Sequence, residues 1–377
     1  MRLPGTPTHN YFFSSSMQRG TPIFTNICRL IKPVARCCAC LLLLILGTGL
    51  PLSAQQPPKA ADLVLNNQPI DITKDNYTEL FRELREKHGF SQQELDTLFQ
   101  HVAIDRKVLE LMDKQWEAKP YYEYWPLFIT PSVIATGKKK LKEYKSLLDR
   151  IEAEIGVDRE YVIAIWGIES RFGANHGKYG VFRTLNTLFD AYPRRAKFFR
   201  DQLIHFLLLC RDNQINPLEV KGSYAGAFGQ TQFIPSSFQE YAVSFDGDSR
   251  RDVFGSIDDI LASIANYLHR FKWTLDAPVY VEIGNQLHSD RLVQANIAGR
   301  KALVGWREVA STQGLTIPRP PLDQGLTIVG LEIHPMEGGG FRYIAGYPNF
   351  QAITAWNNSN RYAMAVSELA EALNGTP

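Results

Sequence analysis

Residues 156–173 have the sequence GVDREYVIAIWGIESRFG. Apolar side chains surround almost the whole helix that this segment predicts, which indicates that the helix is buried. Asp158 is placed to cap the N-terminus, Glu160 suits the positive end of the helix dipole, and Gly173 is placed to end the helix. The segment therefore predicts a buried helix that carries one carboxyl group, that of Glu169, in its last turn.

Glu169 is predicted to act as a general acid. Its helical neighbours at i−4, i−3 and i+3 are Ile165, Trp166 and Phe172. Desolvation beside these groups and the negative end of the helix dipole both raise a carboxyl pKa, as proton donation near neutral pH requires. The alternative is a surface glutamate that pairs with Arg171 or Arg183.

The first 54 residues have the pattern of a secretory signal peptide. Basic residues precede the apolar run 41–46, and small residues follow it. The run is shorter than the roughly 20 residues that span a bilayer, and the alternative is a retained membrane anchor. Met17 is an alternative start to Met1. We expect export to the periplasm.

Charge and cysteine content narrow the function classes. The chain has 41 Lys and Arg against 39 Asp and Glu; removal of the leader takes five basic residues, which leaves 36 against 39, a charge near −3. This balance does not suggest a nucleic-acid binder. Four of the five cysteines lie in the leader, none at a lipidation position, so Cys210 alone remains and no intrachain disulfide is expected.

The rest of the chain predicts mostly helices. Residues 77–84 carry an apolar helical face that Gly89 ends, Ser91 and Glu94 form a capping box, and a long helix is expected after Pro131. After residue 273 the pattern changes. Residues 279–281 and 326–329 are typical of strands, residues 336–341 of a hairpin turn, and a final helix is expected near Arg361.

Several motifs occur in order along the chain. They are Glu-Ser-Arg-Phe-Gly at 169–173, Tyr-Pro-Arg-Arg at 192–195, the Gly-rich segment 221–237, Ala-Asn-Tyr at 265–267, Pro-Asn-Phe at 348–350 and Trp-Asn-Asn-Ser at 356–359. This set resembles the lytic murein transglycosylase B family, which includes membrane-bound and soluble members of the lysozyme-like superfamily. The resemblance spans roughly residues 75–375.

The resemblance implies an α+β, mostly helical fold: a lysozyme-like catalytic core with an additional helical region and a small antiparallel β subdomain. The expected divisions are a signal peptide (1–54), a linker (55–74), an N-terminal helical region (75–155), the catalytic core (156–275), a β-rich subdomain (276–346) and a C-terminal segment whose helix returns to the cleft (347–377).

The resemblance also implies a reaction. The family cleaves the β-1,4 bond between N-acetylmuramic acid (MurNAc) and N-acetylglucosamine (GlcNAc) in peptidoglycan without adding water, and it leaves a 1,6-anhydroMurNAc end. Glu169 would serve as acid and then as base. The loop 222–235 contains no Asp or Glu, in keeping with a single catalytic carboxyl. The alternatives are a hydrolytic muramidase on the same bond and a non-catalytic peptidoglycan-binding protein.

Substrate contacts are expected from polar and aromatic residues. In the Gly-rich loop, Ser223 and Gln232 offer neutral hydrogen bonds to sugars; the alternative is a plain turn. The resemblance implies that both residues flank the catalytic carboxyl and that Ser223 bonds to Glu169. The resemblance implies further cleft positions at Tyr124, Tyr267, Asn357 and Tyr362. For each of the three tyrosines, the alternative is a core residue. Arg194 and Arg195 are candidates to bind lactyl or peptide carboxylates, or are a surface pair at a helix start.

Residues 244–255 resemble the start of an EF-hand calcium loop. Asp246, Asp248 and Asp259 are the candidate ligands of a structural Ca²⁺, and no cofactor is required for the expected reaction. The loop departs from the pattern, because Ser249 replaces the turn glycine and Gly255 stands where the closing glutamate belongs. Asp259 alternatively caps the next helix after Ser256. The expected partners are peptidoglycan strands and, as further candidates, proteins of cell-wall synthesis or division.

Overall fold

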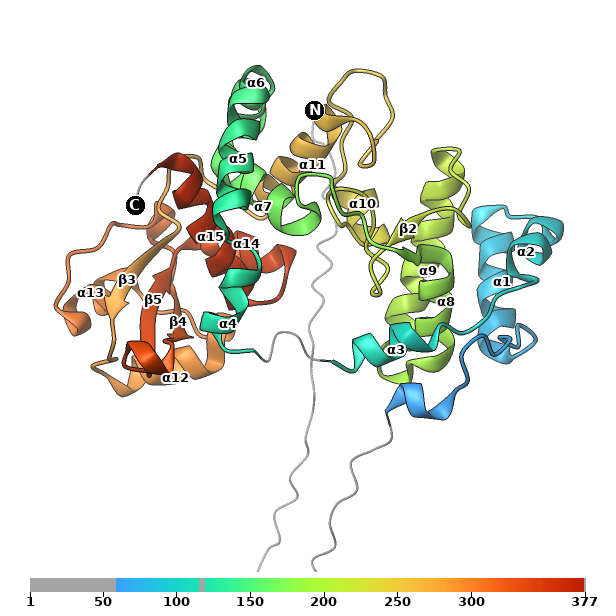
Figure 1. The fold of residues 1–377 in the computed structure, drawn as a ribbon, viewed down its shortest axis with the longest axis horizontal. Helices are drawn as coiled ribbons and strands as arrows, with labels where there is room; N and C mark the ends of the chain where they lie inside the picture. The colour runs from blue at the N-terminus through green and yellow to red at the C-terminus, as the bar shows by residue number, and fades with distance from the viewer. Residues whose placement is uncertain (1–58, 115–118, 376–377) are drawn as a thin grey trace, which may run out of the picture. The chain divides into compact units, whose positions relative to one another are not determined.

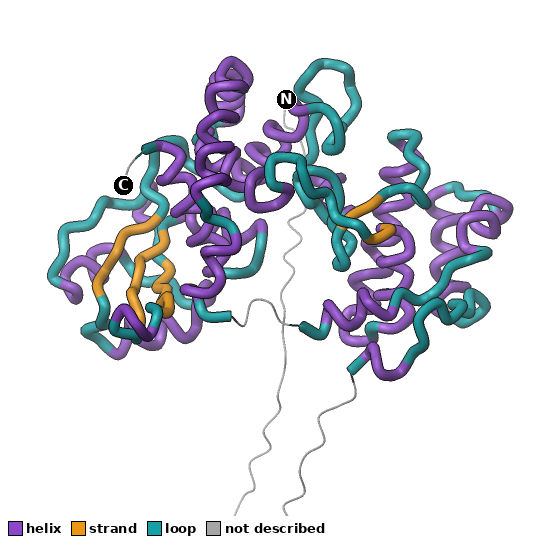
Figure 2. Tube along the Cα trace, in the orientation of Figure 1, coloured by secondary structure: helices purple, strands orange, loops and turns teal. Residues whose placement is uncertain are grey.

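The structure is a computed structural model that describes residues 59–114 and 119–375. The predicted signal peptide and both candidate start methionines lie outside the described residues. Helices predominate, and the strands form two small antiparallel sheets (Figure 2). The predicted α+β class with a mostly helical chain is confirmed. Among the described residues, no helix is both long and apolar enough to cross a membrane.

The first hydrophobic core is built by two separate parts of the chain (Figure 1). It joins α1 (Asp75–His88), α2 (Gln92–Phe99) and α3 (Arg106–Met112) to α8 (Val181–Ala191), α9 (Ala196–Asp212) and α10 (Pro235–Tyr241). The predicted apolar face of α1 is buried, and Gly89 ends the helix with a φ of 70°. The capping box of Ser91 and Glu94 is present, with Glu94 N donating to Ser91 Oγ over 3.2 Å.

Part of the predicted linker is structured. Residues Ala60–Leu63 form the short helix η1, in which Ala61 is buried. Ile70 is also buried, and Pro69 forms a β-bridge with Ala103. Arg106 Nε donates to the carbonyl of Ala61 over 2.8 Å. These contacts attach residues 59–74 to the first core, so the linker interpretation is wrong for this part.

The second core surrounds α7, the helix of the Glu169 segment. It contains α4 (Tyr121–Tyr124), α5 (Pro131–Glu143), α6 (Lys145–Ile155), α7 (Arg159–Ser170), α11 (Ile257–Arg270), α14 (Pro348–Trp356) and α15 (Asn360–Asn374). Helix α7 contacts α5, α6, α11 and α15, and most of its residues are buried as predicted. The region predicted as one helical unit, 75–155, is therefore divided between two cores, with α1–α3 in one and α4–α6 in the other.

Two local predictions in this core are wrong. Asp158 is the N-cap residue of α7 but does not cap it: its carboxylate accepts hydrogen bonds from Trp273 Nε1 (2.7 Å) and from the backbone N–H of Asp276 (3.2 Å). The single long helix expected after Pro131 is two helices, because Tyr144 leaves helical geometry at φ −104° and ψ 22°.

The β-rich part holds a three-stranded antiparallel sheet. Its strand order is β3 (Tyr280–Gly284), β5 (Phe341–Gly346), β4 (Thr327–Glu332), with a register shift between Glu282 and Gly284. Side chains on one face join the second core, and those on the other join a third core with α12 (Asp290–Ala298) and α13 (Trp306–Gln313). The predicted strands and the glycine-containing hairpin between β4 and β5 are present. After β5 the chain returns to the second core through α14 and α15, which contact each other. Helix α14 also contacts α11, and α15 contacts α7.

Glycines shape the loop that follows α9. The short strands β1 (Tyr179–Gly180) and β2 (Lys221–Gly222) pair, and the loop then folds back over residues 222–233. A Cβ atom on Gly222 would lie 2.1 Å from the carbonyl oxygen of Ala227, and one on Gly177, at a φ of 84°, would lie 2.1 Å from that of Gly222. Only glycine fits at these two close approaches.

Candidate active site

Glu169 lies in the last turn of α7, where the chain makes an unusual exit. The helix ends at Ser170, and three residues in succession, 171–173, have positive φ angles. The expected terminator, Gly173, thus stands three residues beyond the helix. Ser170 Oγ accepts a hydrogen bond from the N–H of Gly173 (3.1 Å) and donates to the carbonyl of Trp166 (3.2 Å). These bonds fix the helix end that carries the carboxyl group.

Two side chains from the C-terminal segment donate to one oxygen of Glu169. Trp356 Nε1 lies 2.9 Å and the Tyr362 hydroxyl 2.5 Å from Oε1. Within the described residues, Oε2 accepts no hydrogen bond from a side chain or the backbone, so it is the oxygen left for a reacting group. The alternative that Glu169 pairs with an arginine is not realised for Arg183, which donates to the carbonyls of Ala103 and Ile104.

The environment raises the pKa of Glu169 to about 7. Desolvation is the main cause, and the hydrogen bonds from Tyr362 and Trp356 oppose it by stabilising the carboxylate. At neutral pH the protonated and ionised forms are therefore present in similar amounts. A carboxyl with this pKa can donate a proton and later accept one.

Glu169 opens onto a cavity of about 510 Å³. The residues that line the cavity are Glu169, Arg195, Phe198, Phe199, Ser223, Tyr224, Ala225, Ala227, Gln232, Ile234, Trp356, Asn357 and Asn358. Five of the predicted site residues, Glu169, Arg195, Ser223, Gln232 and Asn357, thus come together here. Glu169 is the sole Asp or Glu among the described residues that line this cavity.

The Gly-rich loop holds its two polar residues by internal hydrogen bonds. Ser223 Oγ accepts from the backbone N–H groups of Ala225 (3.2 Å) and Ala227 (3.1 Å), so the predicted bond from Ser223 to Glu169 is replaced by bonds within the loop. Gln232 has a φ of 50°, and its Nε2 donates to the carbonyl of Gly229 over 2.8 Å. Both side chains line the cavity in fixed positions.

Four residues predicted to bind substrate do not line this cavity. Tyr362 is buried and contacts Glu169 instead. Tyr267 is buried, and its hydroxyl donates to the carbonyl of Ala355 over 2.7 Å. Tyr124 is buried beside Phe128, with ring centroids 5.1 Å apart. Arg194 is exposed and pairs with Asp113 over 2.9 Å. Tyr362 and Tyr267 act from the core, because the first bonds to Glu169 and the second packs against Trp356 with ring centroids 4.6 Å apart.

Eight of the thirteen lining residues were missed by sequence reasoning, and five of these carry aromatic or amide side chains. Phe198, Phe199, Tyr224, Trp356 and Asn358 are among the cavity residues. Phe198 and Phe199 follow Arg195 at the helical spacing that brings side chains together, and the Arg195 guanidinium stacks over both rings, 4.2 and 5.3 Å from their centroids. This spacing was the available signal. Trp356 and Asn358 lie within a quoted motif. Their local sequence does not indicate that they lie near Glu169 on α7, which is almost 190 residues earlier in the chain.

The three carboxylates of the predicted calcium loop accept hydrogen bonds from the loop itself. Asp259 is fully buried and accepts hydrogen bonds from the backbone N–H groups of Phe245 (2.6 Å), Asp246 (3.4 Å) and Asp252 (2.8 Å). Asp246 accepts from Ser256 Oγ and Asp248 N, and Asp248 from Arg250 N. In the parts of the chain that are described, no group of three or more His, Cys, Asp or Glu side chains is arranged to hold a metal ion. The predicted ligand set stays a prediction; in this structure its oxygens accept hydrogen bonds from the loop.

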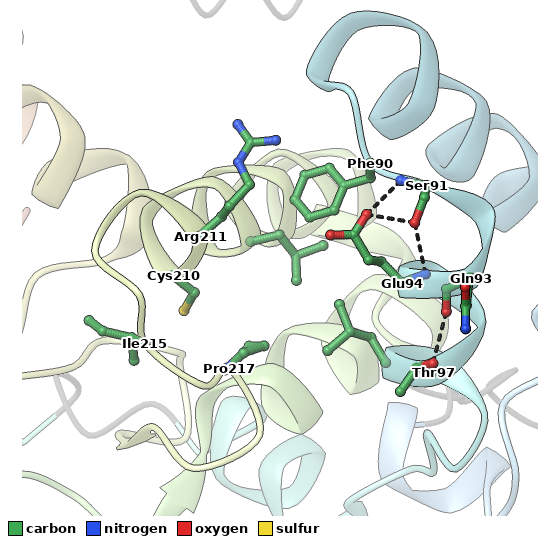
Figure 3. Close-up of a pocket in the computed structure, with 11 residues that line it drawn as sticks. Phe90, Ser91, Gln93, Glu94, Thr97, Cys210, Arg211, Ile215 and Pro217 are labelled. Carbon is green, nitrogen blue, oxygen red and sulfur yellow. Dashed lines mark hydrogen bonds between the residues drawn. The ribbon is translucent and has the colours of Figure 1, made fainter.

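A separate cavity of about 460 Å³ lies between the α1–α2 turn and α9 (Figure 3). Phe90, Cys210 and Pro217 are among its lining residues, with Ser91 and Glu94 of the capping box at one side. Burial raises the pKa of the Cys210 thiol to about 12, so the thiol stays protonated and is a poor nucleophile. This cavity holds no group prepared for catalysis.

Cys210 is therefore expected to be chemically silent in the folded protein. An aromatic disulfide that releases a coloured thiolate should modify almost none of the Cys210 thiol in the native mature protein at pH 8. The reason is that the side chain is buried and neutral. The same reagent should titrate one thiol per chain after unfolding in urea. Rapid reaction in the absence of urea would show that the α9 region opens.

Comparison with known proteins places the chain in a family. Residues 73–371 match the family described as Transglycosylase SLT domain. Membrane-bound lytic murein transglycosylase B of Escherichia coli (strain K12) is 35% identical over 310 residues, which are 79% of this chain and 82% of that protein.

Solved structures of related proteins support the same family assignment. Escherichia coli lytic transglycosylase Slt35, in complex with calcium, superposes with a TM-score of 0.70 at 33% identity, covering 82% of this chain and 96% of that one. SltB3 from Pseudomonas aeruginosa, in complex with NAG-NAM-pentapeptide, does so with a TM-score of 0.67 at 32% identity, covering 80% and 79%. The chain therefore belongs to the family of lytic murein transglycosylases, the lyases that cleave peptidoglycan.

Proposed function

We propose that this enzyme cleaves the β-1,4 bond between MurNAc and GlcNAc without water and releases 1,6-anhydroMurNAc ends, with Glu169 as acid and then base. The observation that carries the proposal is a solitary carboxyl with a pKa of about 7 in the cavity. Glycosidases that use a nucleophile or an activated water need a second carboxylate about 5–10 Å away. Among the described cavity residues, none other than Glu169 supplies one.

The steps follow from the two protonation states of Glu169. Protonated Glu169 donates its proton from Oε2 to the glycosidic oxygen, the bond from that oxygen to the MurNAc anomeric carbon breaks, and the GlcNAc hydroxyl leaves. The MurNAc 6-hydroxyl then bonds to the anomeric carbon and gives its proton to the Glu169 carboxylate. The enzyme ends in the form in which it began, and the product lacks the elements of water.

Product mass tests this proposal. Purified sacculi digested with the mature enzyme should yield muropeptides that are lighter than the hydrolytic products by one water. Products with reducing MurNAc ends would instead show a hydrolytic muramidase. Binding to sacculi without any released muropeptide would show a non-catalytic peptidoglycan-binding protein.

We further propose that Arg195, rather than Arg194, binds a carboxylate of the lactyl group or peptide stem. Arg195 lines the cavity and stacks on Phe198 and Phe199, whereas the guanidinium of Arg194 is paired with Asp113. A planar guanidinium held on aromatic rings keeps its N–H groups free for a carboxylate. A solved relative in complex with NAG-NAM-pentapeptide supports a substrate that carries a peptide.

The adjacent arginines give a matched pair of variants. Arg195→Ala should raise KM for peptide-bearing glycan about tenfold, the value of one charge-assisted hydrogen bond, with little change in kcat. On glycan stripped of its peptides the change in KM should be smaller. Arg194→Ala should leave both constants near those of the wild type. Steady-state kinetics on the two substrates measure these effects, and equal losses in both variants would contradict the assignment.

Export to the periplasm by a signal peptide of residues 1–54 accords with this substrate, which lies outside the cytoplasmic membrane. We propose that the chain acts there on glycan strands and that any contacts with cell-wall synthesis or division proteins are made by the mature part. Mass spectrometry of the protein from a periplasmic extract, read at its N-terminus, tests the processing site.

A further inference from the structure

The corner between α14 and α15 supplies the donors that hold Glu169. Helix α14 ends at Trp356, Asn357 and Asn358 line the cavity, and Tyr362 lies in the first turn of α15. The last carbonyl groups of a helix have no partner within it and need donors from elsewhere. The position of Trp356 therefore depends on what bonds to the end of α14.

Two donors from other parts of the chain bond to these carbonyls. Arg300, in the short helix η5 (Gly299–Lys301) after α12, donates from Nη1 to the carbonyl of Thr354 over 2.8 Å and to its Oγ1 over 3.3 Å. The Tyr267 hydroxyl donates to the neighbouring carbonyl of Ala355 over 2.7 Å. A cation at a helix C-terminus also interacts favourably with the helix dipole.

Arg300 also orients a residue of the cavity. Its Nη2 donates to Oδ1 of Asn358. A guanidinium has only donors, so the amide oxygen of Asn358 faces Arg300 and its NH₂ group is left to donate elsewhere. Because Asn358 lines the cavity, that group is available to a sugar hydroxyl or acetamido oxygen.

We propose that Arg300 is a positioning residue of the active site, through which the β-rich part of the chain holds the α14–α15 corner so that Trp356 donates to Glu169 and Asn358 presents its NH₂ to substrate. The inference rests on the proposed role of Glu169. It gives the β-rich segment a part in catalysis, since Arg300 belongs to that segment while the residues it holds belong to the C-terminal helices.

The expected readout is a shift in pH dependence, so the charged and titratable groups near Glu169 matter. They are Tyr362 on α15, Tyr124 on α4 and Tyr267 on α11 behind it, and Arg195 across the cavity. Burial raises the pKa of Tyr267 and Tyr362 above the usual value of a tyrosine, so these two hydroxyls stay neutral where Glu169 titrates.

Loss of Arg300 should move the alkaline limb of the activity profile to higher pH. The hydrogen bond from Trp356 stabilises the carboxylate and lowers the pKa of Glu169. If the corner moves, this bond lengthens, the pKa rises, and the acid form persists to higher pH. Misplacement of the reacting group at the same time should reduce kcat about tenfold to a hundredfold.

The experiment compares Arg300→Ala and Arg300→Lys with Arg291→Ala, in the mature enzyme, by pH profiles of kcat and kcat/KM on purified sacculi. Arg291 lies on α12 in the same segment and pairs with Glu308 over 2.8 Å at the surface, so its variant should behave as wild type. Arg300→Lys should restore part of kcat, since an ammonium can still reach one carbonyl. A far-ultraviolet circular dichroism melt of each variant checks that it is folded.

A double-variant cycle separates positioning from general weakening. Trp356→Phe alone should give the same alkaline shift, and adding Arg300→Ala to it should move the profile little further, because both changes remove one hydrogen bond. An active wild type with an unshifted Arg300→Ala profile, or additive shifts, would overturn the inference alone. A wild type that releases no anhydro products would instead overturn the proposed function.

Discussion

Glu169→Gln is expected to reduce the release of anhydromuropeptides from sacculi by at least about 10³-fold. General acid–base catalysis by a placed side chain contributes about 10²–10⁴ to a rate, and here one group performs both proton transfers. Glutamine keeps the size of the side chain, and its Oε1 can still accept the hydrogen bonds from Trp356 and Tyr362. The variant therefore removes the proton and leaves the site in shape.

Glu160→Gln is the matched control, since Glu160 lies in the first turn of the same helix, away from the cavity. It should retain wild-type activity. Muropeptide release is measured by chromatography and mass spectrometry against the same amount of folded enzyme. Retention of more than a tenth of wild-type activity in Glu169→Gln would assign the proton transfers to another group.

The same variant has a second, thermodynamic consequence. Burial raises the pKa of Glu169 from 4.5 to about 7, so between these pH values the folded chain holds a proton that the unfolded chain has lost. Stability therefore falls as pH rises through this window, by up to about 3 kcal/mol once pH exceeds 7. Glu169→Gln should unfold at a higher urea concentration than wild type at pH 8 and at a similar one at pH 4. A difference that is the same at both pH values would mean that the carboxyl is not desolvated.

Local features were predictable from sequence because short-range physics decides them. The apolar face of α1, its end at Gly89 and the capping box at Ser91 involve residues within four positions of one another. The burial of α7 was predictable as well, because a helix that is apolar all round has no face for water. Glu169 followed from its place in that helix and from the motif that contains it.

Sequence reasoning missed features that depend on hydrogen-bond partners from distant parts of the chain. Asp158 has the right position for an N-cap, but Trp273, 115 residues later, donates to its carboxylate. Tyr267 and Tyr362 were predicted to meet sugar, yet both hydroxyls bond to protein groups from distant helices. A tyrosine's sequence context does not reveal which end of its ring will be buried, because packing partners decide it. Arg300 had no local signal, since its acceptors lie more than 50 residues further on.

Asp259→Ala is expected to destabilise the fold by about 3 kcal/mol or more. The buried carboxylate accepts the backbone N–H groups of Phe245 and Asp252 at 2.6 and 2.8 Å and that of Asp246 at 3.4 Å, and each buried donor left without an acceptor costs about 1–3 kcal/mol. Asp258→Ala is the control, because Asp258 is partly exposed and pairs with Arg150 only over 3.7 Å. Urea unfolding followed by tryptophan fluorescence measures both.

Calcium distinguishes this interpretation from an EF-hand. If the three acceptor bonds already satisfy Asp259, its oxygens are not offered to a cation, and binding would have to break them. The melting temperature of the wild type should then be the same in millimolar Ca²⁺ and in EDTA, because a ligand that binds only the folded state raises it in proportion to its affinity. A rise with Ca²⁺ that Asp259→Ala abolishes would show that the loop exchanges its own amides for a metal. In that case the departures from the EF-hand pattern at Ser249 and Gly255 would weaken a calcium site without removing it.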